Sequence, residues 1–211
     1  MGIKPGKFIV LEGIDGAGTT TQADLLVTHL LKEGRQTRLT REPSTGPVGS
    51  LLRGVLGGRV VGPELDGEHL PIPNDVIALL FAGDRLDHLA CEVDPALERG
   101  DWVVSDRYVH SSVIYQSVEG ELDWIRGINS RARVADVCYV LDISADQAAA
   151  RRSHRGSEEI YEKLDFQRKV AEGYRRLPEI FPGQAIVMID GSADAATVQA
   201  SILSDLTLRF G

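Results

Sequence analysis

The spacing of Gly13 and Gly18 points to a turn that could bind phosphate groups. An apolar, β-branched run from Phe8 to Leu11 precedes this turn and predicts a buried strand, and a helical pattern opens at Thr19 or Thr20. Glycines let the backbone N–H groups of such a turn converge on an anion, and the helix N-terminus adds partial positive charge. The combination of strand, glycine-rich turn and helix therefore predicts a phosphate-binding loop.

One position departs from the Walker A pattern G-x-x-x-x-G-K-[ST], because Thr19 stands where the pattern has lysine. Thr20 occupies the Ser/Thr position that binds Mg²⁺. A glycine-rich turn without a ligand is the alternative, but the preceding strand and the amphipathic helix that follows favour the phosphate loop. Arginines elsewhere, a monovalent cation or stronger reliance on Mg²⁺ could compensate for the lysine. Otherwise the chain would bind nucleotide and turn over slowly or not at all.

Two further strand ends carry charged residues, namely the stretch from Arg41 to Gly46 and the pair Asp106-Arg107. Ligands of open parallel sheets bind beyond the carboxyl ends of the strands. Arginine guanidinium groups suit phosphate because they hold it with two hydrogen bonds and stay charged. One anion on the glycine loop and a second near Arg41 and Arg107 would be arranged for phosphoryl transfer. The alternative for Arg107 is a surface salt bridge.

The composition fits one α/β domain over residues 1–211. The chain has 23 Lys and Arg against 31 Asp and Glu, a net charge of −8, which disfavours a nucleic-acid partner. Cys91 and Cys138 lie far apart without metal-ligand spacing and indicate a reducing compartment. Neither a signal peptide nor a membrane-spanning run is apparent, so we expect a cytoplasmic protein without a membrane partner.

The remaining pattern alternates short apolar runs with helical stretches, which predicts a five-stranded parallel sheet flanked by helices. The expected strands after the first are 37–40, 102–105, 137–141 and 185–189. The expected helices are 47–56, a helix capped by Asn74 or Asp75 that runs past Arg85, and stretches near 94–99, 122–134, 145–152, 159–177 and 195–208. Residues 57–73 are expected to form a loop.

Five blocks of residues resemble the thymidylate kinases, a family of P-loop nucleoside monophosphate kinases, over nearly the whole chain. They are the Phe8–Gly18 loop, Thr40–Pro43, Leu79–Arg85, Asp106-Arg107-Tyr108 with Ser111, Ser112, Tyr115 and Gln116, and a basic stretch with Tyr161-Glu162 and Phe166-Gln167. The resemblance implies a P-loop kinase fold with a monophosphate-binding region at about 41–116 and a short basic lid at about 151–161. It also implies a homodimer.

The resemblance assigns roles residue by residue. ATP would be bound by Arg151 and the loop residues Gly13, Ile14, Asp15, Gly16, Ala17, Gly18, Thr19, Thr20 and Thr21. Phe81 is similar to the residue that stacks on thymine, and Arg85 to the donor to a thymine carbonyl. Arg107, Arg41 and Arg53 would clamp the monophosphate, Tyr115 would face the deoxyribose, and Ser111, Ser112 and Gln116 could bind the base edge. The alternative for Phe81 is a residue of the hydrophobic core. The alternative for Ser111, Ser112 and Gln116 is that they make no contact with a ligand.

The implied reaction is Mg²⁺-dependent transfer of the ATP γ-phosphoryl group to dTMP. The acceptor phosphate is already ionised near neutral pH, so catalysis would need alignment and charge neutralisation rather than a general base. Thr20 and Asp106 would hold the metal, directly or through water, Asp15 would help to place the acceptor, and the lid arginines Arg151 and Arg155 would neutralise charge. Transfer to another deoxynucleotide or deoxynucleoside, and a nucleotide-binding protein without activity, are the alternatives.

Overall fold

The computed structural model describes residues 6–152 and 164–211 of the chain, with the side chain of Arg152 left out. The expected lid arginine Arg155 and the neighbouring pair Tyr161-Glu162 lie outside these ranges, as does the start of the helix expected at 159–177. None of the described helices combines the length and apolarity that a bilayer-spanning helix needs.

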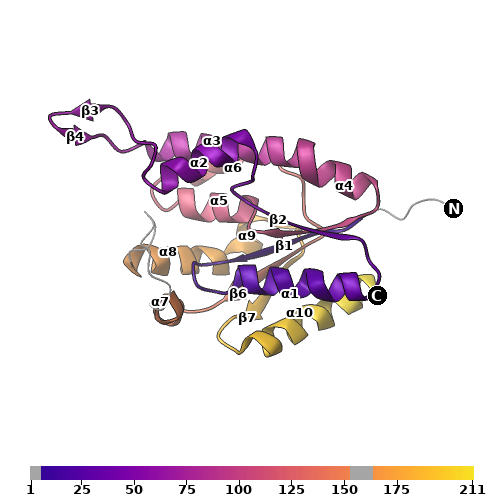
Figure 1. The fold of residues 1–211 in the computed structure, drawn as a ribbon. Helices are drawn as coiled ribbons and strands as arrows, with labels where there is room; N and C mark the ends of the chain where they lie inside the picture. Colours follow the sequence, from indigo (N-terminus) through magenta and orange to yellow (C-terminus); the bar gives the residue numbers. More distant parts are fainter. Residues whose placement is uncertain (1–5, 153–163) are drawn as a thin grey trace.

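A parallel sheet of five strands lies at the centre of the described fold, as the sequence predicted, in the order β2-β5-β1-β6-β7 (Figure 1). The strands are β1 (Phe8–Gly13), β2 (Thr37–Arg41), β5 (Trp102–Asp106), β6 (Val137–Asp142) and β7 (Ile186–Asp190). β1 and β5 are buried along their whole length, as expected of apolar runs covered by helices on both faces. Leu11 pairs with Asp106, so the glycine loop after β1 and the turn after β5 begin side by side.

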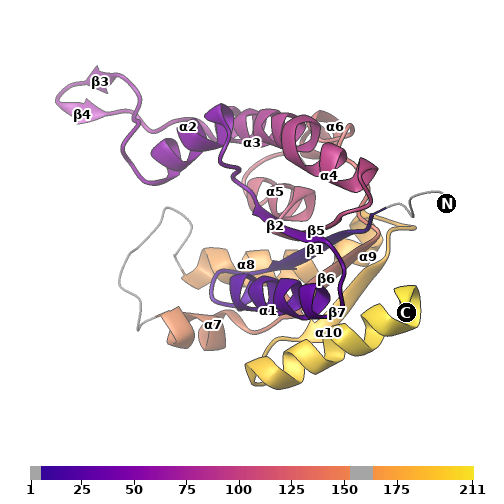
Figure 2. The ribbon, with the colours of Figure 1, turned by 45° about the vertical axis from the view of Figure 1, so that its right-hand side comes forward.

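Helices cover both faces of the sheet (Figure 2). α1 (Thr19–Lys32) and α10 (Ala195–Phe210) pack together on one face. On the other face, α5 (Val109–Gln116) contacts β1 and α8 (Leu164–Arg175) contacts β6, and the two helices contact each other. The remaining helices are α2 (Pro47–Leu56), α3 (Asn74–His88), α4 (Asp94–Glu98), α6 (Leu122–Ile128), α7 (Ala145–Arg152) and α9 (Leu177–Ile180).

The segment 57–73 is more structured than the sequence reading expected. It contains a two-stranded hairpin, β3 (Glu64–Leu65) and β4 (Glu68–His69), which projects from the body of the molecule (Figures 1 and 2). Asp66 and Gly67 connect the strands with φ angles of 53° and 84°. An Asp-Gly pair with two positive φ angles is a common hairpin turn, and this local signal was missed because the flanking strands are so short.

Three helix predictions were wrong in detail. Neither Asn74 nor Asp75 caps α3, because Pro73 is the N-cap residue, and the Asn74 side chain instead donates to the Gln116 carbonyl at 3.2 Å. The helix expected to reach residue 134 ends at Ile128, where Asn129 is the C-cap residue. A π-helical turn at Leu89–Val93 joins α3 to α4, which were expected to be separate.

Candidate active site

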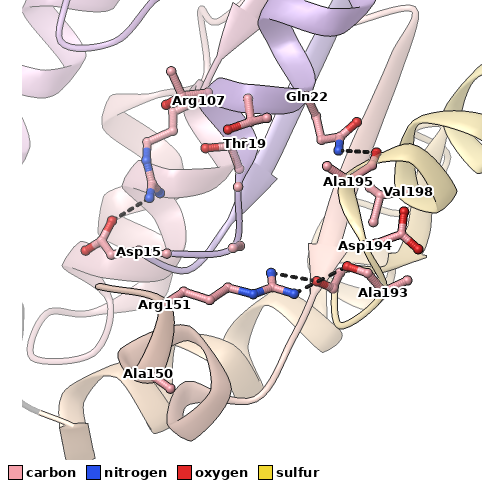
Figure 3. Close-up of a pocket in the computed structure, with 16 residues that line it drawn as sticks. Asp15, Thr19, Gln22, Arg107, Ala150, Arg151, Ala193, Asp194, Ala195 and Val198 are labelled. Atoms are coloured by element: carbon pink, nitrogen blue, oxygen red, sulfur yellow. Dashed lines mark hydrogen bonds and ion pairs between the residues drawn. The ribbon is translucent and has the colours of Figure 1, made fainter. Parts of the chain in front are cut away.

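The glycine loop leaves the N-terminus of α1 without a side-chain cap. Gly18 is the N-cap residue in the left-handed region at φ 100°, which favours glycine, and as a glycine it has no side chain that could accept a hydrogen bond from the helix. The first N–H groups of an uncapped helix need an external partner. Residues 15–22 line a cavity of about 840 Å³ at this helix end (Figure 3). An anion in this cavity would supply that partner.

Thr19 contributes no positive charge to this cavity, which is the larger of the two that form the candidate site and is called the larger cavity below. Its side chain lines the cavity but is only 6% exposed. A Cβ atom on Gly13 would lie 3.4 Å from the Thr19 Cγ2 atom, so the methyl group packs close to the start of the loop. Among the residues that the structure describes, the cationic side chains lining this cavity belong to Arg107 and Arg151.

Arg151 stabilises the wall of the larger cavity opposite the glycine loop. Its guanidinium donates to the carbonyl oxygens of Gly191 at 2.9 Å, Ser192 at 3.1 Å and Ala193 at 3.3 Å. Figure 3 shows Arg151 pointing toward Ala193. Gln22 of α1 holds the same wall by donating to the Ala195 carbonyl at 2.9 Å. Arg151 therefore fixes the turn after β7, which forms one side of the cavity.

Thr20 and Asp106 form a pair that fits a hard cation. Thr20 Oγ1 donates to Asp106 Oδ2 at 2.5 Å. Asp106 Oδ1 is buried and has no hydrogen-bond partner among the described residues. The part of the chain that the structure describes includes no cluster of three or more acidic, histidine or cysteine side chains that could hold a metal ion without other ligands. Mg²⁺ at phosphate sites is held by one or two carboxylates, phosphate oxygens and water, so a hydroxyl beside one carboxylate is a suitable donor set.

Arg107 lies between the larger cavity and a second one. Its backbone is in the left-handed region at φ 72°, which is strained for a residue with a Cβ atom. Its Nη2 atom lies 2.5 Å from Asp15 Oδ1 (Figure 3), and its Nη1 atom donates to the Gly13 carbonyl at 2.9 Å and to Ser111 Oγ at 3.1 Å. Arg107 and Asp15 line both cavities, so a group bound there would contact the occupants of each.

The second cavity is smaller, about 150 Å³, and is lined by aromatic and polar side chains together. Its lining residues are Asp15, Glu42, Pro43, Leu56, Phe81, Arg85, Arg107, Tyr108, Ser111, Ser112, Tyr115 and Gln116. Phe81 and Arg85 come from one face of α3, and Tyr115 lies under the Arg107 guanidinium, 5.4 Å from the ring centroid. The Gln116 Oε1 atom is buried and has no hydrogen-bond partner among the described residues. A planar polar ring would find both stacking and hydrogen-bonding surfaces here.

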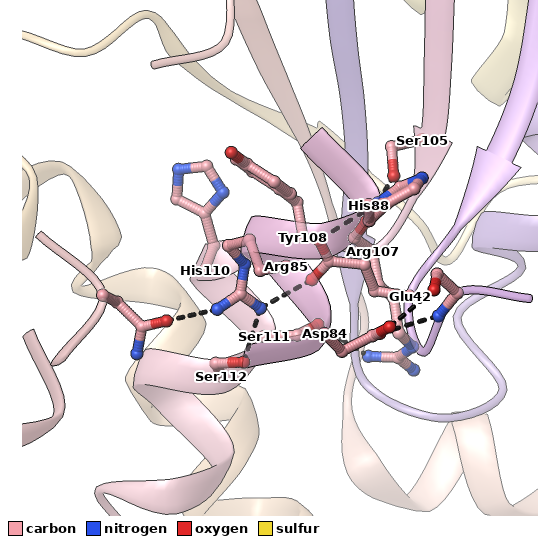
Figure 4. A network of polar contacts seen from close by, with 12 residues as sticks. Glu42, Asp84, Arg85, His88, Ser105, Arg107, Tyr108, His110, Ser111 and Ser112 are labelled. Atoms are coloured by element: carbon pink, nitrogen blue, oxygen red, sulfur yellow. Dashed lines mark hydrogen bonds and ion pairs between the residues drawn. The ribbon is translucent and has the colours of Figure 1, made fainter. Parts of the chain in front are cut away.

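Arg85 is fixed in a buried polar network (Figure 4). Its side chain is 1% exposed, and its Nη2 atom donates to Glu42 Oε2 at 2.6 Å and to Ser112 Oγ at 2.7 Å. Its Nη1 atom donates to Asn129 Oδ1. His88 adds a contact to the same carboxylate, with Nδ1 3.4 Å from Glu42 Oε1. The guanidinium is therefore held rigidly at the wall of the smaller cavity.

The neighbouring residue Asp84 holds the turn that follows β2. Both its oxygens accept hydrogen bonds from Ser44, from the backbone N–H at 2.7 Å and from Oγ at 2.5 Å (Figure 4). Asp84 and Arg85 thus connect α3 to the turn after β2, Asp84 through Ser44 and Arg85 through Glu42. Sequence reasoning assigned no role to Asp84 or Glu42, although an acidic residue within a mostly apolar helix is a visible signal of a buried partner.

Two arginines expected at the monophosphate do not line the smaller cavity. Arg41 is exposed at the end of β2. Arg53 is also exposed, and its guanidinium donates to the carbonyl oxygens of Pro43 and Ser44 and to Ser50 Oγ. Arg53 therefore supports the turn after β2, and Arg107 is the arginine that the structure places between the two cavities.

Comparison with known proteins matches this chain to one family. The family model described as thymidylate kinase matches residues 11–202. A relative from Thermococcus kodakarensis is 40% identical over 207 residues, which cover 97% of this chain and 98% of the relative. Relatives from Pyrococcus horikoshii (40% identical, 86% of this chain and 87% of the relative) and Methanococcus vannielii (39%, 82% and 79%) are similar. Each of the three bears the name "Probable thymidylate kinase".

Proposed function

Since the chain belongs to the thymidylate kinase family, we propose that it transfers the γ-phosphoryl group of ATP to dTMP and so forms dTDP and ADP. ATP occupies the larger cavity with its phosphates on the glycine loop and the N-terminus of α1. The acceptor occupies the smaller cavity with its phosphate toward Arg107.

The observation that best supports this function is that Asp15 and Arg107 line both cavities. Phosphoryl transfer needs the acceptor oxygen and the γ-phosphorus to be in line and close together, and most of the catalysis comes from that alignment and from charge neutralisation. Two cavities that share one arginine would place the two nucleotides close enough for this alignment. Nucleotides bound in separate cavities would be too far apart for the transfer.

The smaller cavity suits a thymine base. Phe81 would stack on the ring, while the fixed guanidinium of Arg85 would donate to a carbonyl oxygen. The buried Gln116 Oε1 atom would accept from the ring N–H, which would give that oxygen a partner. Tyr115 would lie against the deoxyribose, and Ser111 and Ser112 would complete the polar edge. A cytosine would present an amino group where Arg85 requires an acceptor.

The Thr20–Asp106 pair would hold Mg²⁺ beside the phosphates of ATP. When bound, the ion neutralises charge that develops on the phosphate oxygens. Asp106 does not act as a general base in this scheme, because the acceptor phosphate is already ionised near neutral pH. Its role is to accept from Thr20 with one oxygen and to present the other.

Thr19 leaves a charge deficit that other residues must fill. The backbone N–H groups of the loop bind the phosphates without the lysine. We assign the neutralising charge at the transferred group to lid arginines, Arg155 first and Arg151 or Arg152 next. Arg155 lies outside the described residues, so its assignment follows from sequence.

The protein forms a homodimer through α3 and α2 in this proposal. Val76, Leu79 and Leu86 of α3 are 43%, 52% and 42% exposed, and their spacing places them along one side of the helix. Leu51 of the adjacent α2 is 45% exposed. An apolar stripe of this kind on two packed helices would be buried by a second copy of the same stripe.

The test is ADP release with dTMP, dUMP, dCMP, dGMP or thymidine as acceptor, with ATP and MgCl₂ present. The proposal predicts the highest kcat/KM with dTMP. A higher value with another nucleotide or with thymidine would favour a different acceptor. Binding of ATP by calorimetry with no ADP release for any acceptor would favour a nucleotide-binding protein without activity.

A further inference from the structure

Glu12 is a buried carboxylate to which the proposed chemistry gives no role. It is the next-to-last residue of β1, and its side chain is 0% exposed. A buried charge is costly unless hydrogen bonds and opposite charges surround it. Glu12 accepts four hydrogen bonds: Oε1 from the backbone N–H groups of Tyr108 at 2.9 Å and Ser111 at 3.1 Å, and Oε2 from Ser111 Oγ at 2.5 Å and Tyr174 Oη at 2.9 Å. Its acceptor capacity is therefore filled.

Glu12 acts as the N-cap of α5 from another element. Tyr108 is the N-cap residue of α5, and no side chain there supplies a capping hydrogen bond. The N–H group of Ser111, at the third helical position, is one that an N-cap side chain usually satisfies, and that of Tyr108 is one that a capping-box side chain satisfies. Both donate to Glu12 instead. The negative charge also interacts favourably with the positive end of the helix. Because Arg107 directly precedes Tyr108, this cap fixes the backbone on the C-terminal side of the strained Arg107.

Glu12 also fixes the guanidinium of Arg107 through two hydroxyl groups. Arg107 Nη1 donates to Ser111 Oγ at 3.1 Å and to Tyr174 Oη at 3.4 Å. Both hydroxyls donate in turn to Glu12 Oε2, so their lone pairs face the guanidinium. Burial, and next the nearby Glu12 charge, raise the pKa of Tyr174 well above its usual value, so the phenol keeps the proton that it donates.

The ionised form of Glu12 is the one that these contacts favour. Burial raises the pKa of its carboxyl, but the nearby His110 and the charge of Arg107 outweigh this effect, so the pKa lies below its usual value. Glu12 therefore carries its charge at neutral pH.

We propose that Glu12 is a positioning residue for phosphoryl transfer, whose carboxylate fixes Arg107 in the orientation in which it meets the acceptor phosphate. It acts through the cap of α5 and through the hydroxyls of Ser111 and Tyr174, and it does not touch the substrate. This inference rests on the proposed transfer to dTMP.

The test compares Glu12→Gln and Tyr174→Phe with a matched control. The control is Tyr139→Phe, because the buried Tyr139 also donates to a carboxylate, that of Asp205 on α10, at 2.9 Å. Neither Tyr139 nor Asp205 lines either cavity. The measurements are kcat, the KM values for dTMP and ATP, the Kd for dTMP by calorimetry without ATP, and the thermal unfolding midpoint.

We expect Glu12→Gln to lower kcat/KM for dTMP roughly 10- to 100-fold, as for the loss of a hydrogen-bond partner of a charged group. Tyr174→Phe should lower it roughly 3- to 10-fold on the same scale. The KM for ATP should change little in either variant, and Tyr139→Phe should alter only the unfolding midpoint. If Glu12→Gln fails to fold, the kcat/KM of Tyr174→Phe for dTMP tests the proposed role of Glu12.

Variants of Glu12 and Tyr174 that match the Tyr139→Phe kinetics would show that the carboxylate is structural and would overturn the inference. A wild-type protein that binds dTMP without turnover would contradict the proposed function, and the dTMP Kd values would then decide the role of Glu12. A wild type that does not bind dTMP at all would contradict both.

Discussion

Arg107 and Asp15 form an ion pair at the junction of the two cavities, with Nη2 2.5 Å from Oδ1. The other oxygen of Asp15 accepts from Gln167 Nε2 of α8 at 3.1 Å. An acceptor phosphate with two negative charges would compete with Asp15 for the same guanidinium. The side chains of Arg107 and Asp15 are 22% and 31% exposed, so a nucleotide can reach them.

Replacing Arg107 by lysine should impair the acceptor side of the reaction. A lysine is a point charge that cannot reproduce the planar fork, so we expect kcat/KM for dTMP to fall by roughly 100-fold, as for a charge-assisted pair worth about 3 kcal/mol. The Kd for ATP should change little. Arg209→Lys is the control, because Arg209 forms a similar ion pair with Asp205 within α10. Wild-type kinetics in Arg107→Lys would remove Arg107 from the acceptor site.

Arg85 should serve both selectivity and stability, and a double variant separates the two. Arg85→Met leaves the Glu42 carboxylate buried without its partner, which should destabilise the fold by roughly 3–5 kcal/mol. Adding Glu42→Gln should restore much of that free energy of unfolding. Both proteins should lose the preference for dTMP over dCMP, measured as a ratio of kcat/KM values. A double variant that regains stability and retains the preference would show that Arg85 does not bind the base.

The sequence predicted the elements with strong periodicity. Most of the candidate site residues that it singled out also line one of the two cavities, and their roles stay predictions. The bounds of α2 and α7 were expected correctly, because their amphipathic pattern is complete. The five-stranded parallel sheet was correct for a similar reason, since its strands are short apolar runs between helical stretches.

The sequence did not reveal the residues that act through long-range contacts. Glu12 of β1 accepts a hydrogen bond from Tyr174 of α8, and Glu42, which follows β2, forms an ion pair with Arg85 of α3. Neither pair has a local pattern, because the spacing follows from how the sheet and helices pack. Arg53 shows the same limit. Its guanidinium donates to the carbonyl oxygens of Pro43 and Ser44, contacts that no local pattern reveals, and its contact with an acceptor phosphate stays a prediction.

The stability of the protein should fall between about pH 7 and pH 10 because of His110. Burial lowers the pKa of this imidazole, but Cys138 and Glu12 raise it, and the pKa in the folded protein is raised to about 10 from 6.5. A raised pKa means that the stabilisation is fully present below pH 6.5 and is lost as the pH rises through 10. Both ring nitrogens face acceptors, with Nδ1 3.7 Å from Glu12 Oε1 and Nε2 3.1 Å from Gln184 Oε1.

The measurement for His110 is the free energy of unfolding of the wild type, His110→Gln and the control His29→Gln at pH 7 and pH 10. We expect the wild type and the control to lose roughly 2–4 kcal/mol more than His110→Gln over this range. Equal losses in all three proteins would show that His110 is neutral at pH 7.

The apolar stripe on α3 should control the oligomeric state. Leu79→Glu introduces a charge into the proposed interface, so light scattering should give the monomer mass of 23.0 kDa where the wild type gives twice that value. Leu208→Glu is the control, because Leu208 is 85% exposed on α10, away from the stripe. A wild type of monomer mass, or a dimeric Leu79→Glu, would contradict this interface.

The most direct test of the central claim, phosphoryl transfer to dTMP without a lysine at position 19, is the rate of dTMP-dependent dTDP and ADP formation. The proteins to compare are the wild type, Thr19→Lys, Arg155→Ala and the double variant. We expect saturable activity in the wild type and a loss of roughly 10³-fold in Arg155→Ala, the scale of a positioned arginine. Thr19→Lys should restore part of that loss in the double variant. Full activity in Arg155→Ala would refute compensation by the lid, and a wild type without activity that gains it on Thr19→Lys would contradict the claim itself.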